Sequence, residues 1–310
     1  MNAFISWTAK QTNSALKNIS VGISHNNREL RRLIASSLLD QGFAEPVCSQ
    51  YLSGVLPDIQ EGKVDVILCE MDGDIRENLN IVREIRHANI GKNPFFIIVA
   101  LCANTEPAHI QQVINCGVDD IVITPVAMAT LTKRIANFYT TRKQFVVTTE
   151  YIGPDRRQSN RDGNQPQFLD VPNPVAAKMS GMSEPEYDAV VRAMSKNLVR
   201  AKISTHAFEF MDIVRAIQTE AEVDLKVAMD RIHKGCHLVA AKLDQDSVVH
   251  KLCDELASLA LRIANSDEPS SKDLRLLPEV GKALYKSFLV SDDTERDLAE
   301  EITDSLSMVV

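Results

Sequence analysis

Short apolar runs alternate with helix-like stretches between residues 18 and 143, and this alternation restricts the fold more than any other feature of the chain. Four runs are rich in β-branched or aromatic residues, at 19–24, 64–69, 95–101 and 120–124, and a weaker one lies at 44–49. Runs of this length that are apolar almost throughout are typical of strands buried on both faces. The sequence therefore predicts five strands in a parallel sheet.

Helix-like stretches fill the gaps between these runs. They lie at 28–41, 50–61, 76–90, 106–116 and 127–142. The first four are followed by Gly42, Gly62, Gly91 and Gly117, and glycine just past a helix end is a common left-handed terminator. Five strands alternating with five helices predict an α/β domain with a doubly wound, flavodoxin-like parallel sheet over residues 18–143.

The rest of the 310-residue chain has a different character. Residues 1–17 form an N-terminal extension, and residues 144–177, called the arm below, are rich in Pro, Gly, Asn and Gln without a sustained apolar period. Such composition predicts a linker, or an extended segment that lies on a neighbouring domain. From 178 to 310 apolar residues recur at helical spacing, which predicts an all-α helical bundle domain.

Five helices are expected in the bundle domain. The first follows a capping-box pattern, Ser183 with Glu186, and the second spans 205–242 with a break near Gly235. The others are expected at 247–264, 271–289 and 292–307.

Charge and composition restrict the class of protein. The formal net charge is −8, and residues 178–310 hold 17 basic against 24 acidic residues (17 − 24 = −7), which makes nucleic acid an unfavourable partner. No apolar run has the 18 or more residues that a membrane-spanning helix needs, and the first residues do not form a signal-peptide pattern. The six cysteines include no C-x-x-C pair. We therefore expect a reduced, cytoplasmic protein.

Four stretches of the first domain carry a resemblance to a known family. They are ISVGISHNNRELRRLI, DVILCEMDGD, IIVALCAN and GVDDIVITPV. In order, spacing and length they resemble the receiver domain of bacterial two-component response regulators over residues 19–142. The last stretch is similar to the Gly-x-x-Asp-Tyr-x-x-Lys-Pro pattern with which such receivers end.

The resemblance implies a phosphotransfer site, and the chain departs from it at nearly every position. Family receivers hold magnesium with two acidic residues after the first strand and with an aspartate at the end of the third strand. That aspartate then accepts a phosphoryl group. A Ser or Thr and a Lys contact the phosphoryl group. The corresponding positions here are His25, Asn26, Glu70, Cys102, Thr124 and Pro125. Only Pro125, which in the family follows a cis peptide bond, matches.

These replacements remove the chemistry group by group. Magnesium prefers several hard oxygen ligands, and His25 with Asn26 supplies no carboxylate. Thr124 provides no cation to neutralise a transferring phosphoryl group. The sequence therefore predicts a pseudo-receiver with no catalytic residue, no metal and no cofactor.

Glu70 has two interpretations. Its carboxylate could mimic phospho-aspartate, or it could be an inert polar residue at a strand end, which we favour because Cys102 and Ile121 lack the groups that would respond to the charge. Asp72 and Asp74 are a weaker possibility as substitute metal ligands.

Three further sets of residues have more than one interpretation. Tyr151, Arg156 and Arg157 could form an interaction arm that binds carboxylates or a partner, or could be a solvated turn. Four residues of the bundle domain could form a zinc site: His233, His237, His250 and Cys253. The favoured interpretation is that the histidines are scattered on helix surfaces and that the cysteine lies in the core. His233 or His237 could also accept a phosphoryl group.

Together these features predict a non-enzymatic signalling adaptor that acts by protein–protein interaction, independently of phosphorylation, with protein partners in a bacterial pathway. The pseudo-receiver would act as a dimerisation or docking module through the surface of its last helices, where family receivers meet one another. The alternative is a phosphorelay protein with a phosphorylatable histidine, and the third possibility is a DNA-binding response regulator, which needs a basic recognition helix.

Overall fold

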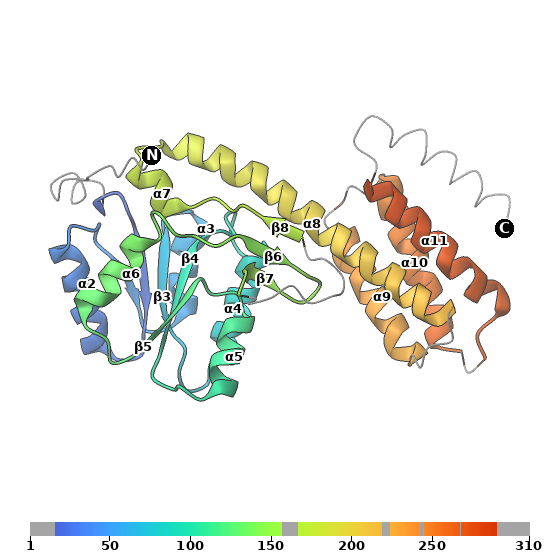
Figure 1. Ribbon diagram of the computed structural model, residues 1–310, viewed down its shortest axis with the longest axis horizontal. Helices are drawn as coiled ribbons and strands as arrows, with labels where there is room; N and C mark the ends of the chain where they lie inside the picture. Colours follow the sequence, from blue (N-terminus) through green and yellow to red (C-terminus); the bar gives the residue numbers. More distant parts are fainter. Residues whose placement is uncertain are drawn as a thin grey trace, which may run out of the picture. The chain divides into compact units, whose positions relative to one another are not determined.

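The computed structural model describes residues 16–156, 167–218, 224–241, 243, 245–266 and 268–289 (Figure 1). They form two compact units. The first unit takes 16–146, 151–156 and 168–197, and the second takes 147–150, 167 and the described residues from 198 onward. The first unit thus extends past residue 177, and the division falls within one long helix.

A five-stranded parallel sheet forms the centre of the first unit (Figure 1). Its strands are β1 (Val21–Ser24), β2 (Val47–Ser49), β3 (Val66–Glu70), β4 (Ile97–Cys102) and β5 (Asp120–Ile123). Their order is β2-β1-β3-β4-β5, and every neighbouring pair is parallel. This is the flavodoxin-like order of doubly wound folds, so the predicted fold class is confirmed.

Helices cover both faces of the sheet. They are α2 (Arg28–Asp40), the 3-10 helix η1 (Leu52–Val55), α3 (Leu56–Gln60), α4 (Arg76–Arg86), α5 (Pro107–Asn115) and α6 (Met128–Asn137). Side chains alternate across β3: Ile67 and Cys69 join one core with η1, α3, α4 and α5, whereas Val66 and Leu68 join another with α2 and α6. Two apolar faces explain why the central strands read as continuous apolar runs.

Most of the described residues of the arm, 144–146, 151–156 and 168–177, belong to the first unit. The arm contains β6 (Phe145–Val147), β7 (Ile152–Pro154) and β8 (Gln167–Leu169), which form a small sheet in the order β7-β6-β8. Helix α7 (Pro174–Met179) follows and buries Val175 and Met179 in the core that α2 and α6 share. Of the two expectations for the arm, the structure therefore shows a segment that lies on a neighbour, and it adds three short strands that the polar composition did not reveal.

Four helices make up most of the second unit. They are α8 (Glu184–Gln218), whose residues from 198 onward belong to this unit, α9 (Leu225–Ala240), α10 (Val248–Ala264) and α11 (Ser271–Leu289). Their apolar faces share a single core, which confirms the predicted all-α bundle. One of the two hydrogen bonds of the predicted capping box is present, since the Ser183 N–H donates to Glu186 Oε2 at 2.9 Å, and the Ser183 hydroxyl donates to the same oxygen at 2.7 Å.

The helix boundaries near Gly235 differ from the prediction. A helix over 205–242 with a break at Gly235 was expected, but α8 is continuous to Gln218, and Gly235 lies inside α9. Gly235 has a packing role: a Cβ there would lie 2.8 Å from the Phe210 ring, so the glycine lets α9 approach α8 closely. The helix expected at 292–307 lies outside the described residues.

All six cysteines are free thiols, and only Cys48 is exposed. Cys69 and Cys102 are buried in β3 and β4, where a thiol packs as a small hydrophobic group. Within the described ranges, no helix is long and apolar enough to cross a membrane.

Candidate functional site

The predicted site positions gather at the carboxyl-terminal edge of the sheet because of the strand register. Ser24 pairs with Cys69, so the next residues of the two strands, His25 and Glu70, reach the same level. Glu70 pairs with Leu101, next to Cys102. Cys102 in turn pairs with Ile123, which Thr124 follows. In open parallel sheets, ligands bind at this edge.

Glu70 points to the loop that follows β1. Its Oε2 accepts a 2.7 Å hydrogen bond from the Asn26 backbone N–H and lies 3.6 Å from His25 Nδ1. The side chain is only 15% exposed. Its carboxylate therefore serves as an anchor for the loop where family receivers have their metal-binding acids.

His25 and its neighbours start α2. His25 Nδ1 accepts a 3.1 Å hydrogen bond from the Asn27 N–H. The Asn27 side chain accepts from the N–H groups of Glu29 and Leu30 and caps the helix. Residues 25–27 are thus engaged in holding the end of β1 to the start of α2.

Asp72 binds the loop that follows β4. Its Oδ2 accepts from the Ala103 N–H at 2.7 Å, and its Oδ1 accepts from the Asn104 N–H at 2.9 Å. His109 Nε2 lies 3.9 Å from the same Oδ1 and makes a 2.7 Å contact with the Met71 carbonyl oxygen. Both carboxylate oxygens therefore have backbone donors, and they connect the ends of β3 and β4.

Asp74, the other candidate for a substitute ligand, pairs with Arg76. Arg76 donates from Nε and Nη2 to the two Asp74 oxygens, at 2.8 and 2.6 Å. These hydrogen bonds lower the pKa of Asp74 to about 2. In the part of the chain that the structure describes, no three His, Cys, Asp or Glu side chains form a group that could hold a metal ion.

Cys102 and Thr124 complete the edge. Burial, with the nearby Asp72 carboxylate, raises the pKa of the Cys102 thiol to about 12. The Thr124 N–H donates to the Cys102 carbonyl at 2.8 Å. The Thr124–Pro125 peptide bond is cis, as the resemblance implies. Thr124 stands where family receivers have a lysine, and its side chain offers a neutral hydroxyl.

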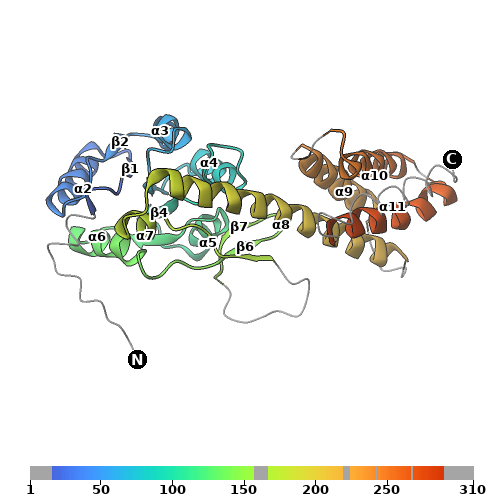
Figure 2. The same cartoon turned by 90° about the horizontal axis from the view of Figure 1, so that it is seen from above.

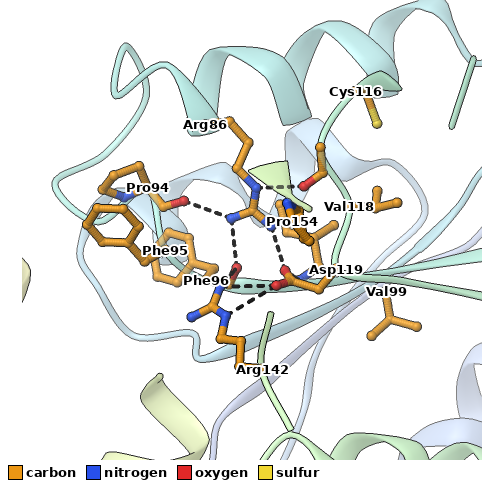
Figure 3. A network of polar contacts seen from close by, with 12 residues as sticks. Arg86, Pro94, Phe95, Phe96, Val99, Cys116, Val118, Asp119, Arg142 and Pro154 are labelled. Atoms are coloured by element: carbon orange, nitrogen blue, oxygen red, sulfur yellow. Dashed lines mark hydrogen bonds and ion pairs between the residues drawn. The ribbon is translucent and has the colours of Figure 1, made fainter. Parts of the chain in front are cut away.

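A second polar cluster lies at the opposite, amino-terminal edge, and the sequence did not reveal it (Figure 3). Arg86, the last residue of α4, is fully buried. It donates to the carbonyl oxygens of Gly117 (2.8 Å), Pro94 (2.7 Å) and Phe96 (2.8 Å), and its Nη2 lies 2.6 Å from Asp119 Oδ2. A buried guanidinium is tolerated because its donors are satisfied in this way.

Asp119 lies between two arginines (Figure 3). Its Oδ2 accepts from Arg86 and from the Ile98 N–H, at 2.6 and 2.8 Å. Its Oδ1 accepts from Nε and Nη2 of Arg142, both at 3.2 Å. The Phe145 ring of the arm lies 5.1 and 5.3 Å from the two guanidinium carbons, within cation–π distance. The cluster thus joins α4, β4, β5 and the arm.

The residues predicted as an interaction arm lie on the first unit. Arg156 donates to the carbonyl oxygens of Val118 and Asp119, at 2.8 and 3.0 Å, so these bonds go to backbone oxygens rather than to carboxylates. The Tyr151 hydroxyl donates to the Pro154 carbonyl at 2.9 Å. Arg157 lies outside the described residues.

Two of the bundle histidines, His233 and His237, lie next to each other on α9. His233 Nδ1 makes a 3.3 Å contact with the Ala257 carbonyl oxygen, and its ring lies 4.4 Å from that of His237, which is exposed. Cys253 is buried. Sequence reasoning did not single out His206, which is buried with Nδ1 3.7 Å from Glu209 Oε2.

Comparison with known proteins gives matches among solved structures. No protein-family model and no curated protein matches the chain. The chain is similar to the chemotaxis protein CheY4 of Vibrio cholerae, with 20% identity over 38% of this chain and 95% of that one, and a TM-score of 0.34. It is also similar to a response regulator from Thermotoga maritima, with 19% identity over 38% of this chain and 94% of that one, and a TM-score of 0.34. The isolated receiver domain of RcsB from Salmonella enterica serovar Typhimurium is 17% identical over 44% of this chain and 94% of its own, with a TM-score of 0.34.

The first unit has the receiver fold. Its strand order and the helices on both faces are those of the flavodoxin-like fold that the resemblance implies. The predicted resemblance is confirmed at the level of the fold.

Proposed function

We propose that this chain is a signalling adaptor of the two-component type, which acts by protein–protein interaction and independently of phosphorylation. One observation carries the proposal. The two carboxylates at the carboxyl-terminal edge, Glu70 and Asp72, accept hydrogen bonds from backbone N–H groups of the neighbouring loops, at 2.7 to 2.9 Å. They act as loop anchors in a site of receiver geometry.

Phosphotransfer chemistry would compete with these contacts. A magnesium ion at the edge needs oxygen ligands in near-octahedral geometry, so a carboxylate would have to give up its amide partners. A phosphoryl group on Glu70 would need a nearby cation and donors, but Thr124 is neutral, and the Ala103 and Asn104 amides are occupied by Asp72. The lysine position and these two amides therefore offer no stabilisation of the developing charge, which supports our inference that the protein is not an enzyme.

The distribution of charge along the chain supports the adaptor function. Residues 178–310 carry most of the net negative charge, 17 basic against 24 acidic residues. An acidic domain favours a partner with a basic face, because complementary charge speeds encounter and rejects wrong partners. We place the protein in the cytoplasm, with protein partners of a bacterial signalling pathway and with a second copy of the chain at the receiver.

A phosphorelay function is the second candidate, and His237 favours it. Its side chain is exposed on α9 of a helical bundle, where an imidazole can act as a nucleophile, whereas His233 is partly buried against the Ala257 carbonyl.

Incubation of the full chain with acetyl phosphate and Mg²⁺, followed by intact mass measurement, tests the proposal. We expect no adduct, while an active receiver in the same reaction becomes phosphorylated. A stoichiometric, hydroxylamine-sensitive adduct that is lost in Glu70→Gln would overturn the inert site. A phosphoryl group transferred to the chain from that active receiver and lost in His237→Gln would establish the second candidate instead.

A further inference from the structure

Two histidines of α9 lie on one side of this helix, near its packing with α10. The two helices share the bundle core and lie side by side (Figures 1 and 2). His233 and His237 are four residues apart, so they project from adjacent turns, and their ring centroids are 4.4 Å apart. His237 is exposed, and His233 is partly buried. Two imidazoles at this spacing on a helix can bind one zinc ion.

The Ala257 carbonyl oxygen of α10 determines which nitrogen of His233 is available. A carbonyl oxygen only accepts, so His233 Nδ1 is the donor in their 3.3 Å contact, and Nε2 carries the lone pair of the neutral ring. Within the described ranges Nε2 makes no hydrogen bond and yet is not buried, so it reaches solvent. Histidines that bind metals usually donate their other N–H to a carbonyl or carboxylate, which orients the ring.

The charges next to the two rings are compatible with a cation. His237 lies in the last turn of α9, where the aligned peptide dipoles leave partial negative charge. Lys234, which follows His233, is paired with Asp230, with 2.6 Å between Nζ and Oδ2. The positive charge of Lys234 is therefore balanced by a carboxylate of the same helix.

The spacing of the rings suits zinc. Zinc binds histidine nitrogens at about 2.0–2.1 Å in tetrahedral geometry, so two such nitrogens lie roughly 3.4 Å apart. Rings with centroids 4.4 Å apart can bring their outer nitrogens to that separation by small side-chain rotations. In the described part of the bundle, no third His, Cys, Asp or Glu forms a group with them, so water would take the other positions of the ion.

We propose that His233 and His237 form a two-histidine zinc site on the surface of the bundle. Of the four residues predicted as a zinc site, the structure brings these two together, and neither His250 nor Cys253 joins them. A bound ion uses the lone pair of His237 that a phosphoryl group needs, so zinc and the phosphorelay function exclude each other at this residue. The site goes beyond the adaptor function and does not depend on it.

Calorimetric titration of the full chain with ZnCl₂ near neutral pH tests the site. All proteins carry Cys48→Ser, which removes the exposed thiol as a competing ligand, and the chain with this change alone is the reference. We expect one zinc ion per chain and at least about tenfold weaker binding in His233→Gln and in His237→Gln, because each loses one of two ligands. His250→Gln is the matched control, since His250 lies in the same bundle with Nε2 3.5 Å from Asp254 Oδ2. Its affinity should equal that of the reference.

Stability provides a second measurement. Zinc should raise the urea midpoint of the reference but not that of His237→Gln, because an ion that binds only the folded state stabilises it. His237 is exposed, so without zinc the two midpoints should agree. Absence of zinc binding to the reference, or equal affinity in all the variants, would overturn the site. A loss in His250→Gln as large as that in His237→Gln would also overturn it, because the ion would then have other ligands.

Discussion

Arg86 and Asp119 form an ion pair, with 2.6 Å between Nη2 and Oδ2, in which the two side chains are 0% and 1% exposed. Burial lowers the pKa of Arg86, and the Asp119 charge opposes that effect. Neither charge is in contact with water, so each depends on the other and on the carbonyl oxygens around them. The pair connects the end of α4 with the start of β5.

Replacing Arg86 with methionine should destabilise the protein by about 3–5 kcal/mol, because it leaves the Asp119 carboxylate buried without its main partner. The measurement is the urea midpoint of the full chain. Arg76→Met is the control, since Arg76 is 89% exposed in its pair with Asp74. Its midpoint should equal that of the wild type. Equal effects of the two substitutions would contradict the importance of burial.

Gly117→Ala should destabilise the protein for two reasons, the positive φ of +96° and the approach of the Ile152 carbonyl. Gly62→Ala isolates the first, because Gly62 has φ +75° with nothing within 4 Å of the added Cβ. We expect a loss of about 1–2 kcal/mol for Gly62→Ala. Gly117→Ala should cost about 1–3 kcal/mol more from the close contact. Equal losses of unfolding free energy in the two variants would show that the arm moves away from the added Cβ at Gly117 without a measurable cost.

The fold of the first unit was predictable because its signals are local. Strands buried on both faces show as apolar runs, such as 95–101, and Gly42 and Gly62 show where helices end. The fold of the arm was not predictable, because its buried residues are separated in the sequence and each makes its own contact with a distant part of the chain. Gly235 was misread as a helix break since only the facing Phe210 explains it.

The candidate site was predictable in position but not in its contacts. Strand order and register bring His25, Glu70 and Cys102 to one edge, and the motif already placed them there. That Asp72 would bind the amides of the next loop depends on a pairing across 31 and 32 residues, which no local pattern reveals. Arg86 was missed for the same reason, as a basic residue at a helix end usually lies in solvent.

Glu70→Gln should retain the Asn26 contact, because an amide oxygen also accepts from a backbone N–H, so we expect a loss of stability of about 1 kcal/mol or less. The oligomeric state should remain that of the wild type, since the site is interpreted as inert. Sedimentation velocity and thermal unfolding of the two proteins provide the measurement. A change in oligomeric state without loss of stability would favour the phospho-aspartate mimic.

A fall in pH should lower the stability of the helical bundle, because Glu209 becomes protonated. Partial burial alone would raise its pKa, but the His206 ring and the Arg231 guanidinium outweigh this effect and hold the pKa below its ordinary value of 4.5. A carboxyl group with a lowered folded-state pKa stabilises the protein above the unfolded value, and this contribution is lost as the pH falls through the folded value. The difference in urea midpoint between wild type and Glu209→Gln should therefore be largest near neutral pH and shrink below 4.5. A constant difference would show that the Glu209 charge contributes nothing.

Thiol chemistry should distinguish Cys48 from the other five cysteines. Cys48 is exposed, whereas the rest are buried, and burial raises the pKa of Cys102 to about 12 and that of Cys116 to about 11. Since the thiolate is the reactive form, titration of the native protein with a coloured disulfide reagent near pH 8 should give one rapid equivalent. Denaturant should release five more, and Cys48→Ser should abolish only the rapid one. Rapid reaction of Cys102 in the native protein would contradict the burial of this thiol at the edge of the sheet.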